Sequence, residues 1–383
     1  MSWRRRALMR WYPMQFERLG RALGRAAHAR RRRGAFQRPF AGKSSRRLLL
    51  LSVDHRIPQS QIFPFHYYAP AFLTQHQTEI REVTTDQYGS RDSHPKGATT
   101  VCFQTNFDIS DADLDALLGR IHARNPGARL VYLDWFAPTD LRLAARIGPR
   151  VDAYLSKHIL RDRAAYLHPT FGDTTLMDHY GRRFGLPHTT QHHSIPDGFM
   201  DKLHLGPSFA TADFMLPVFH KGALPPSAPR PVDLHARLAV AGTPWYQAMR
   251  GECAAAVAAL DGVRTITGTG IRHDLFLREM RASKLCFSPF GYGEACWRDY
   301  EAVMTGAVLI KQDMGHVQTD PDIFRPFESY VPVKWDLSDL DEKIRWLLAD
   351  EAARARIAGA AFALLQDYAR SGRFVTDMAG VIA

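Results

Sequence analysis

Residues 287–310 read FSPFGYGEACWRDYEAVMTGAVLI, and this stretch decides the fold. An apolar segment ends in the turn GYGE (291–294), and residues 297–304 then have the composition of a helix that ends at Gly306. The run AVLIKQD (307–313) predicts a buried strand. A strand, a glycine-containing turn, a helix and a second strand in this order are typical of a parallel α/β sheet.

Arg298 and Glu301 are three positions apart, so they share one face of the predicted helix near its N-terminus. Free backbone N–H groups at such a terminus, with glycines before it, form a favourable binding site for phosphate. Arg298 adds a bidentate phosphate contact, and Glu301 offers two acceptors for the paired hydroxyls of a ribose. The alternative interpretation is an ordinary surface ion pair, which contributes little to stability.

The alternation of strands and helices continues on both sides of this stretch. In the second half, predicted strands alternate with predicted helices. The predicted strands are 233–242, 262–270, 285–291, 307–313 and 327–336, and the predicted helices are 245–260 and 276–284. The segment KGALPPSAPRP (221–231) precedes them and is the best candidate for a linker.

The first half has the same alternation. Its predicted strands are 47–54, 78–85, 99–105, 128–135 and 151–157, and its clearest helix is 108–127. We therefore expect two Rossmann-like α/β domains that face each other across a cleft. The predicted divisions are a basic arm (1–47), a first domain (48–220), a second domain (221–350) and C-terminal helices (351–383).

Ligands in such sheets bind beyond the carboxyl ends of the strands. His55 follows the first strand and is a candidate general base, with Asp54 or Asp134 as its orienting partner or as an alternative base. His192 and His193 are weaker candidates, and no carboxylate stands at a metal-ligand spacing beside them. The first strand lacks a following GxGxxG, so we expect no NAD or FAD site there.

The charge is concentrated at the N-terminus. Of the overall formal net charge of +11, residues 1–47 carry +14, and the remainder of the 383-residue chain carries −3. Arginines interleaved with Trp, Phe and Leu in this arm favour an anionic membrane surface. A solvated tail is the alternative, and binding to nucleic acid is the least favoured interpretation.

The cysteines and the hydropathy pattern indicate a cytoplasmic protein. Cys102, Cys253, Cys286 and Cys296 have no CxxC or Cys/His spacing, so we expect free thiols and no structural zinc. The apolar run at 48–53 is too short to span a membrane or to act as a secretory signal. The expected location is cytoplasmic, with peripheral attachment to the inner face of the membrane through the arm.

The segment 283–314 resembles the nucleotide-sugar-binding segment of GT-B glycosyltransferases, and is most similar to the exostosin-like branch of the group 1-like enzymes. Residues 340–365 also resemble the C-terminal helices of these enzymes. The resemblance implies a nucleotide-sugar donor in the second domain, an acceptor in the first, and a last helix that crosses back to the first domain. Beyond 283–365 the resemblance is one of architecture.

The resemblance also implies roles for individual residues. Glu301 would bind the donor ribose, and Arg298 would lie near the diphosphate. The other implied donor-binding residues form the turn before the helix or follow the first strand of the domain: Gly291, Tyr292, Gly293, Glu294 and Arg250. Lys284 and Asp313 are weaker candidates.

One departure concerns the paired glutamates of retaining GT-B enzymes, which are separated by seven residues. Glu294 and Glu301 are separated by six, and Gly293 stands at the expected position, so neither the first glutamate nor the retaining outcome carries over. No DxD motif lies in a suitable loop, which favours a metal-independent reaction without a cofactor, in which Arg and helix N–H groups stabilise the leaving group.

The predicted function is therefore a glycosyltransferase that moves a sugar from a nucleotide-diphosphate donor to a glycan or lipid-linked acceptor, in surface polysaccharide biosynthesis. One alternative is another nucleotide-sugar enzyme with two Rossmann-like domains, such as an epimerase or a phosphorylase. The other is a non-catalytic protein that binds nucleotide or glycan. No nucleic-acid partner is expected.

Overall fold

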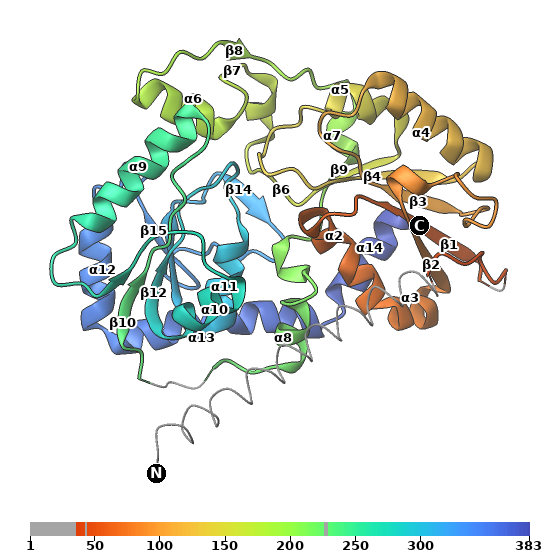
Figure 1. Ribbon diagram of the computed structural model, residues 1–383. Coiled ribbons are helices and arrows are strands. Elements are labelled where there is room, and N and C mark those ends of the chain that lie inside the picture. Colours follow the sequence, from red (N-terminus) through yellow and green to blue (C-terminus); the bar gives the residue numbers. More distant parts are fainter. Residues whose placement is uncertain (1–35, 43, 226–228) are drawn as a thin grey trace.

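The computed structural model describes residues 36–42, 44–225 and 229–383. Most of the predicted basic arm, residues 1–35 and 43, lies outside the described residues. Figure 1 shows two α/β units next to each other, the first coloured red to yellow and the second green to blue. No helix of the described residues is long and apolar enough to cross a membrane.

The first unit is built on a six-stranded parallel sheet with the order β2-β1-β3-β4-β5-β9. Its strands are β1 (Arg46–Ser52), β2 (Thr78–Thr84), β3 (Thr100–Phe103), β4 (Arg129–Asp134), β5 (Ala153–Ser156) and β9 (Leu203–Leu205). The predicted strands are therefore present, though several are shorter than expected.

The leucine run of β1 explains why this sheet has a core on each face. Because side chains alternate along a strand, Leu49 and Leu51 enter one apolar cluster while Leu48 and Leu50 enter another. All four side chains are at most 1% exposed. A continuous apolar run of this kind is typical of a parallel strand that is covered by helices on both faces.

The second unit is a five-stranded parallel sheet with the order β11-β10-β12-β13-β15. Its strands are β10 (Val232–His235), β11 (Thr265–Ile266), β12 (Ser283–Phe287), β13 (Val308–Gln312) and β15 (Val331–Val333). The predicted α/β class with two Rossmann-like sheets is confirmed.

Helices cover both sheets. In the first half they are α2 (Arg56–Tyr67), α3 (Ala69–His76), α4 (Asp111–Arg124), α5 (Ala144–Ile147), α6 (Thr175–Arg183), α7 (Phe199–Lys202) and α8 (Leu216–Lys221). In the second half they are α9 (Pro244–Ala258), α10 (His273–Arg281), α11 (Trp297–Thr305), α12 (Leu340–Ala349), α13 (Glu351–Arg370) and α14 (Arg373–Ile382). The 3-10 helix η5 (Phe209–Thr211) contacts both α2 and α11.

The last two helices connect the units. Helix α13 contributes Ile357 and Phe362 to the core of the second unit, and Figure 1 shows it running beneath that unit toward the first. Helix α14 contributes Phe374 and Met378 to a core of the first unit. The Thr100 hydroxyl donates to the Ile382 carbonyl oxygen at 2.8 Å, which fixes the end of the chain to β3.

Two further features join the units at their facing edges. Strand β6 (His158–Leu160), which follows β5, pairs antiparallel with β14 (Val317–Thr319), which follows β13. Between β6 and β9, the short antiparallel strands β7 (Thr170–Phe171) and β8 (Thr190–Gln191) flank α6. Helix α6 contacts α9 and contributes Leu176 and Tyr180 to the core of the second unit. A segment of the first half therefore reaches across to the second.

Candidate functional site

The sheet order places a ligand position in the second unit. In an order of this type the connections leave the first and third strands toward opposite faces, which opens a crevice at their carboxyl ends. Here those strands are β10 and β12. The turn 291–294 and the N-terminus of α11 follow β12, so the stretch that decides the fold also lies at this crevice.

Buried contacts fix the N-terminus of α11. Cys296 is the N-cap, and its backbone N–H donates to the Asp299 carboxylate at 2.8 Å. The Ser288 hydroxyl donates to the same carboxylate at 2.6 Å, and the Lys311 Nζ lies 3.3 Å from it. Asp299 and Lys311 are both fully buried. This buried ion pair holds the helix on the sheet, and sequence reasoning missed it.

Two arginine side chains, one buried and one partly buried, lie beside this terminus. Arg250, on α9, is 6% exposed, and Arg298 is on α11. The Arg250 Nε and the Arg298 Nε and Nη1 are buried and have no hydrogen-bond partner among the described residues. A Cβ built at Gly291 would lie 3.8 Å from the Arg250 Nη2, so Arg250 lies next to the glycine turn.

The electrostatics of these two arginines favour an anion. Burial lowers the pKa of Arg250, and the neighbouring charge of Arg298 lowers it further. Two like charges that are removed from water without a carboxylate partner destabilise the folded protein. A diphosphate between them would offset this cost and would take up the unused N–H donors.

Glu301 lies on the same helix and is held by a histidine. Its Oε1 is 2.5 Å from Nε2 of His273, the first residue of α10, and its side chain is 6% exposed. His273 therefore occupies one of the two oxygens that we expected to face ribose hydroxyls. The other carboxylate oxygen has no hydrogen bond from the described residues. Sequence reasoning placed Glu301 on this face but did not find His273.

The glycine turn (291–294) packs closely against the first unit. The Gly291 N–H donates to the Gly293 carbonyl oxygen at 3.0 Å. A Cβ built at Gly293 would lie 1.6 Å from the Ala137 carbonyl oxygen. The contact with Ala137 leaves no room for a side chain at position 293. A glutamate therefore cannot stand there, where the retaining pattern has its first glutamate.

Tyr292 covers the outer side of the turn. Its ring stacks on Tyr246 at 4.5 Å and 10°, and its hydroxyl accepts from the Thr243 N–H at 3.2 Å. The side chain is 45% exposed. Tyr246 in turn lies under the Arg250 guanidinium at 5.1 Å, so Tyr292 and Arg250 flank the same aromatic ring.

Glu294 points toward the first unit. It is 1% exposed, and its Oε1 accepts from the Thr139 hydroxyl at 2.9 Å. The same oxygen lies 3.7 Å from the Nε2 of His316, while Oε2 has no partner among the described residues. The structure thus places Glu294 at the contact between the units, on the side where His316 lies.

The turn that carries the candidate base of the first unit lies next to this region. His55 is exposed and is the N-cap of α2, where its Nδ1 accepts from the Ile57 N–H at 3.4 Å. The adjacent Arg56 guanidinium lies 4.8 Å from the Phe214 ring and 4.7 Å from the ring of Trp297, the first residue of α11. Asp54 is exposed. The β1–α2 turn and the N-terminus of α11 are therefore neighbours.

Asp134 does not orient His55. It is 3% exposed, and its carboxylate accepts from the Tyr154 hydroxyl at 2.7 Å and from the Phe136 N–H at 3.0 Å. Burial raises its pKa to about 6. Asp134 ties the end of β4 to β5, and the expectation that it assists His55 is wrong.

The weaker candidates are scattered. The Lys284 Nζ is 2.7 Å from Asp233, and both residues lie near the amino ends of their strands, away from the crevice. The His193 Nε2 donates to the Asp173 carbonyl oxygen at 3.2 Å, and His192 is exposed. Asp313 follows β13 at the carboxyl edge. No group of three His, Cys, Asp or Glu able to hold a metal occurs in the described part of the chain.

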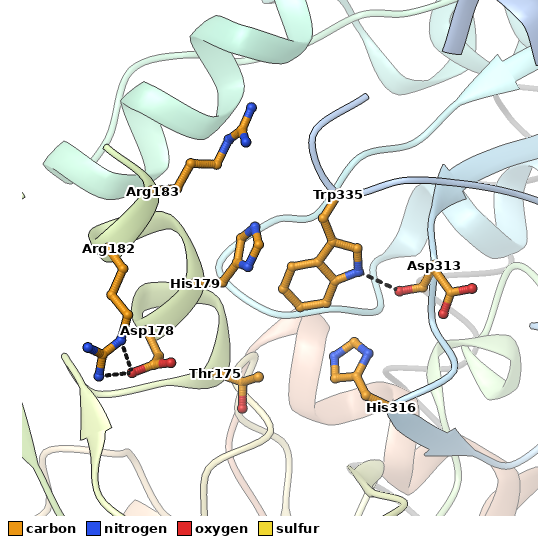
Figure 2. Close-up of a pocket in the computed structure, with 8 residues that line it drawn as sticks. All are labelled: Thr175, Asp178, His179, Arg182, Arg183, Asp313, His316 and Trp335. Atoms are coloured by element: carbon orange, nitrogen blue, oxygen red, sulfur yellow. Dashed lines mark hydrogen bonds and ion pairs between the residues drawn. The ribbon is translucent and has the colours of Figure 1, made fainter. Parts of the chain in front are cut away.

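Two cavities adjoin α6: one lies between α6 and the residues that follow β13 and β15, and the other lies between the segment 160–195 and the residues that follow β13. The larger measures about 740 Å³, and Figure 2 shows the eight residues that line it. The smaller measures about 400 Å³. Neither is lined by Arg250, Arg298 or Glu301.

Lys157 is a buried cation that sequence reasoning missed. It follows β5, is 1% exposed, and its Nζ lies 4.2 Å from the centroid of the Phe209 ring without a hydrogen-bond partner among the described residues. Burial lowers its pKa to about 7, although Asp134 acts in the opposite direction. A lysine directly after a buried strand was the only signal in the sequence.

The low pKa of Lys157 predicts a pH dependence of stability. Above pH ~7 the folded protein releases this proton while the unfolded chain retains it up to its ordinary pKa, so the free energy of unfolding should rise with pH in this window. Relative to Lys157→Met, wild type should gain about 2 kcal/mol between pH ~7 and pH ~9. Urea unfolding at several pH values measures this difference, with the exposed Lys334→Met as control. Parallel pH profiles for wild type and Lys157→Met would contradict the assignment.

Comparisons with known proteins agree with this architecture. No family model and no curated protein matches the sequence. An alpha-glucosyltransferase (AGT) in complex with UDP superposes with a TM-score of 0.51 at 9% identity, over 87% of this chain and 98% of that chain. An alpha-glucosyltransferase in complex with UDP and a 13-mer DNA containing a HMU base gives a TM-score of 0.50 at 10% identity, over 87% and 97%.

The chain has the GT-B fold. The two Rossmann-like domains, their facing carboxyl edges and the crevice between β10 and β12 are therefore those of a GT-B protein. The identities of 9% and 10% carry the comparison no further than the fold.

Proposed function

We propose that this protein is a glycosyltransferase that uses a nucleoside-diphosphate sugar. The observation that carries the proposal is the pair Arg250 and Arg298, whose buried nitrogens (Nε of Arg250, Nε and Nη1 of Arg298) have no partner among the described residues. They lie at the crevice of the second GT-B domain, next to the N-terminus of α11. A diphosphate is the anion that best fits two adjacent guanidinium groups and a helix terminus.

The roles of the donor-binding residues follow from this placement. Arg250 and Arg298 would hold the diphosphate and would stabilise the charge that develops on it when the sugar leaves. Glu301, oriented by His273 at 2.5 Å, would accept from a ribose hydroxyl through its remaining oxygen. Gly291, Tyr292 and Gly293 would form the wall of the donor site on the side of the first domain.

His55 is the proposed general base. It stands at the carboxyl end of β1, and its neighbour Arg56 contacts Trp297 at the start of α11. In this role the imidazole would take the proton of the acceptor hydroxyl while that oxygen attacks the anomeric carbon and the nucleoside diphosphate departs. Asp54 is the carboxylate next to it in the chain and is the proposed second member of this pair.

Four further parts of the proposal come from the sequence. They are the exostosin-like branch, metal independence, a glycan or lipid-linked acceptor in surface polysaccharide biosynthesis, and a cytoplasmic location with the arm on an anionic membrane. UDP is the first nucleotide to test, because a GT-B structure with a similar fold contains it. We propose no nucleic-acid partner, although a second similar structure contains DNA.

A donor screen tests the proposal. The purified full chain is incubated with sugar nucleotides of UDP, GDP, CMP and dTDP, and free nucleotide and sugar are measured with and without acceptor glycans. The expected result is slow release of one nucleotide diphosphate without acceptor and faster release with it, in the presence of EDTA. Interconversion of the donor sugar without transfer would favour an epimerase. Tight nucleotide binding without any turnover would favour a non-catalytic binding protein.

A further inference from the structure

The two cavities that adjoin α6 form one groove. Thr175, Asp178 and His316 line both of them, so the cavities adjoin. We call this the α6 groove: it runs between the segment 160–195 of the first half and the residues that follow β13 and β15 of the second. It is separate from the arginine pair, because neither Arg250 nor Arg298 lines it.

An indole ring with fixed orientation stands in the groove. The Trp335 Nε1 donates to the Asp313 carbonyl oxygen at 3.0 Å. The rings of His179 and His316 lie 4.7 Å and 5.0 Å from the Trp335 ring, at 74° and 65°. Figure 2 shows the indole between these two histidines. An aromatic face of this kind attracts the C–H groups of a sugar ring, because the ring face carries negative and the C–H edge positive partial charge.

The polar side chains around the indole suit hydroxyl groups. The Nε2 atoms of His179 and His316 are buried and have no hydrogen-bond partner among the described residues. The carboxylate of Asp313 receives one bond, from the Gly315 N–H at 2.7 Å, and Asp173 lines the same groove. Ring nitrogens and carboxylates together offer both donors and acceptors, which is what a polyhydroxylated ligand requires.

The charge of the groove disfavours an anionic ligand. Arg182 is paired with Asp178 at 3.0 Å and Arg183 with Glu252 at 2.5 Å. Three lining carboxylates form no ion pair with a described residue: Asp162, Asp173 and Asp313. Among the lining arginines of the described residues, Arg161 alone forms no ion pair. A phosphate or a uronate would meet net negative charge here, and an uncharged sugar would not.

The position of the groove connects it to the donor site. His316 lines both cavities, and its Nε2 is 3.7 Å from the Oε1 of Glu294. Glu294 ends the glycine turn whose other side faces Arg250. Its second oxygen is buried and has no partner among the described residues. A ligand in the groove would therefore reach the donor site past Glu294 and His316.

We infer that the α6 groove binds an uncharged saccharide, and that this saccharide is the acceptor, with one sugar ring stacked on Trp335. The term acceptor rests on the proposed glycosyltransferase function, whereas saccharide binding itself does not. His316, which lines both cavities and lies 3.7 Å from the buried Glu294, is positioned to contact the end of the ligand that is nearest the donor. An acidic glycan and a nucleic acid are the competing occupants.

Binding of defined glycans to the full chain tests this inference. The probes are uncharged oligosaccharides that end in glucose, galactose or N-acetylglucosamine, matched uronate-terminated oligosaccharides, and a short duplex DNA. Binding of at least one uncharged probe is expected, and Trp335→Leu should weaken it by about tenfold or more. Asp313→Asn should weaken it as well without altering the apolar core. The matched control is Trp346→Leu, which removes a partly buried tryptophan of the same core outside the groove.

The outcomes separate the two proposals. Loss of saccharide binding in Trp335→Leu and Asp313→Asn, with the thermal midpoint preserved in Asp313→Asn and saccharide binding preserved in Trp346→Leu, supports the groove. If saccharide binding depends on Trp335 but the protein binds no nucleotide, the proposed function is contradicted and saccharide binding in the groove is still supported. Preference for uronate probes or DNA, absence of binding to every uncharged probe, or equal binding by all variants would overturn the inference.

Discussion

Arg298→Ala is expected to weaken UDP binding by at least about tenfold, because a hydrogen bond to a charged group contributes about 1.5–3 kcal/mol. The Arg298 Nε and Nη1 are buried donors without a partner in the described residues, so a bound diphosphate is the group that would use them. Arg298→Lys should recover only part of the affinity, since an ammonium group cannot form the bidentate contact.

A third substitution at this position gives a readout that an ordinary ion pair would not give. Because Arg298 has no carboxylate partner within the described residues, Arg298→Met should leave the ligand-free protein at least as stable as wild type. Isothermal titration with UDP and urea unfolding measure the two effects. Arg345→Ala, which removes an exposed arginine paired with Asp341, is the control for loss of one positive charge. Unchanged UDP affinity in Arg298→Ala would refute the role of this residue.

Gly293→Ala is expected to lower the free energy of unfolding by more than about 2 kcal/mol, an effect at the upper end of overpacking. The added Cβ would lie 1.6 Å from the Ala137 carbonyl oxygen and 2.4 Å from its carbonyl carbon. Both are backbone atoms, so relief requires the two domains to move apart at the glycine turn. The variant should therefore also lose activity, because the donor and acceptor sides would no longer face each other.

Gly291→Ala is the matched control for this prediction. It lies in the same turn, but the nearest atom to its added Cβ would be the Gly293 carbonyl oxygen at 3.7 Å, an ordinary van der Waals contact. Urea unfolding of both variants decides the matter. If Gly293→Ala were as stable as Gly291→Ala, the close approach of the turn to Ala137 would not exist in solution.

The parts of the fold that depend on local pattern could be predicted from the sequence. The apolar run of β1 and the strand–turn–helix at 283–305 have strong local signals, so the two sheets and the face shared by Arg298 and Glu301 were foreseeable. Boundaries were less accurate: β10 ends at His235, not at 242, because the residues that follow leave the sheet to form the crevice.

The parts of the site that depend on contacts distant in the sequence could not be predicted. The bond between Glu294 and Thr139 spans 155 positions, and His273 is 28 positions from Glu301. Neither partner stands out in the sequence, since histidines and threonines are common. The buried pair of Asp299 and Lys311 could not be predicted for the same reason, because a charged residue in a core is recognised only when its partner is known.

The crossing of α6 to the second unit has a similar cause. The segment 161–195 follows β6 of the first half, so chain order assigned it to the first domain. Its apolar residues Leu176 and Tyr180 instead complete the core of the second unit. The groove lined by Trp335 and His179 arises only from this crossing, and no pattern in either segment alone indicates it.

A crystal structure of the full chain with UDP tests the central claim most directly. The account predicts that the diphosphate lies within hydrogen-bond distance of both the Arg250 and the Arg298 guanidinium groups, at the N-terminus of α11. It also predicts that a ribose hydroxyl donates to Glu301. A diphosphate bound elsewhere, for instance in the α6 groove beside Arg182 and Arg183, with Arg250 and Arg298 left without a partner, would contradict it.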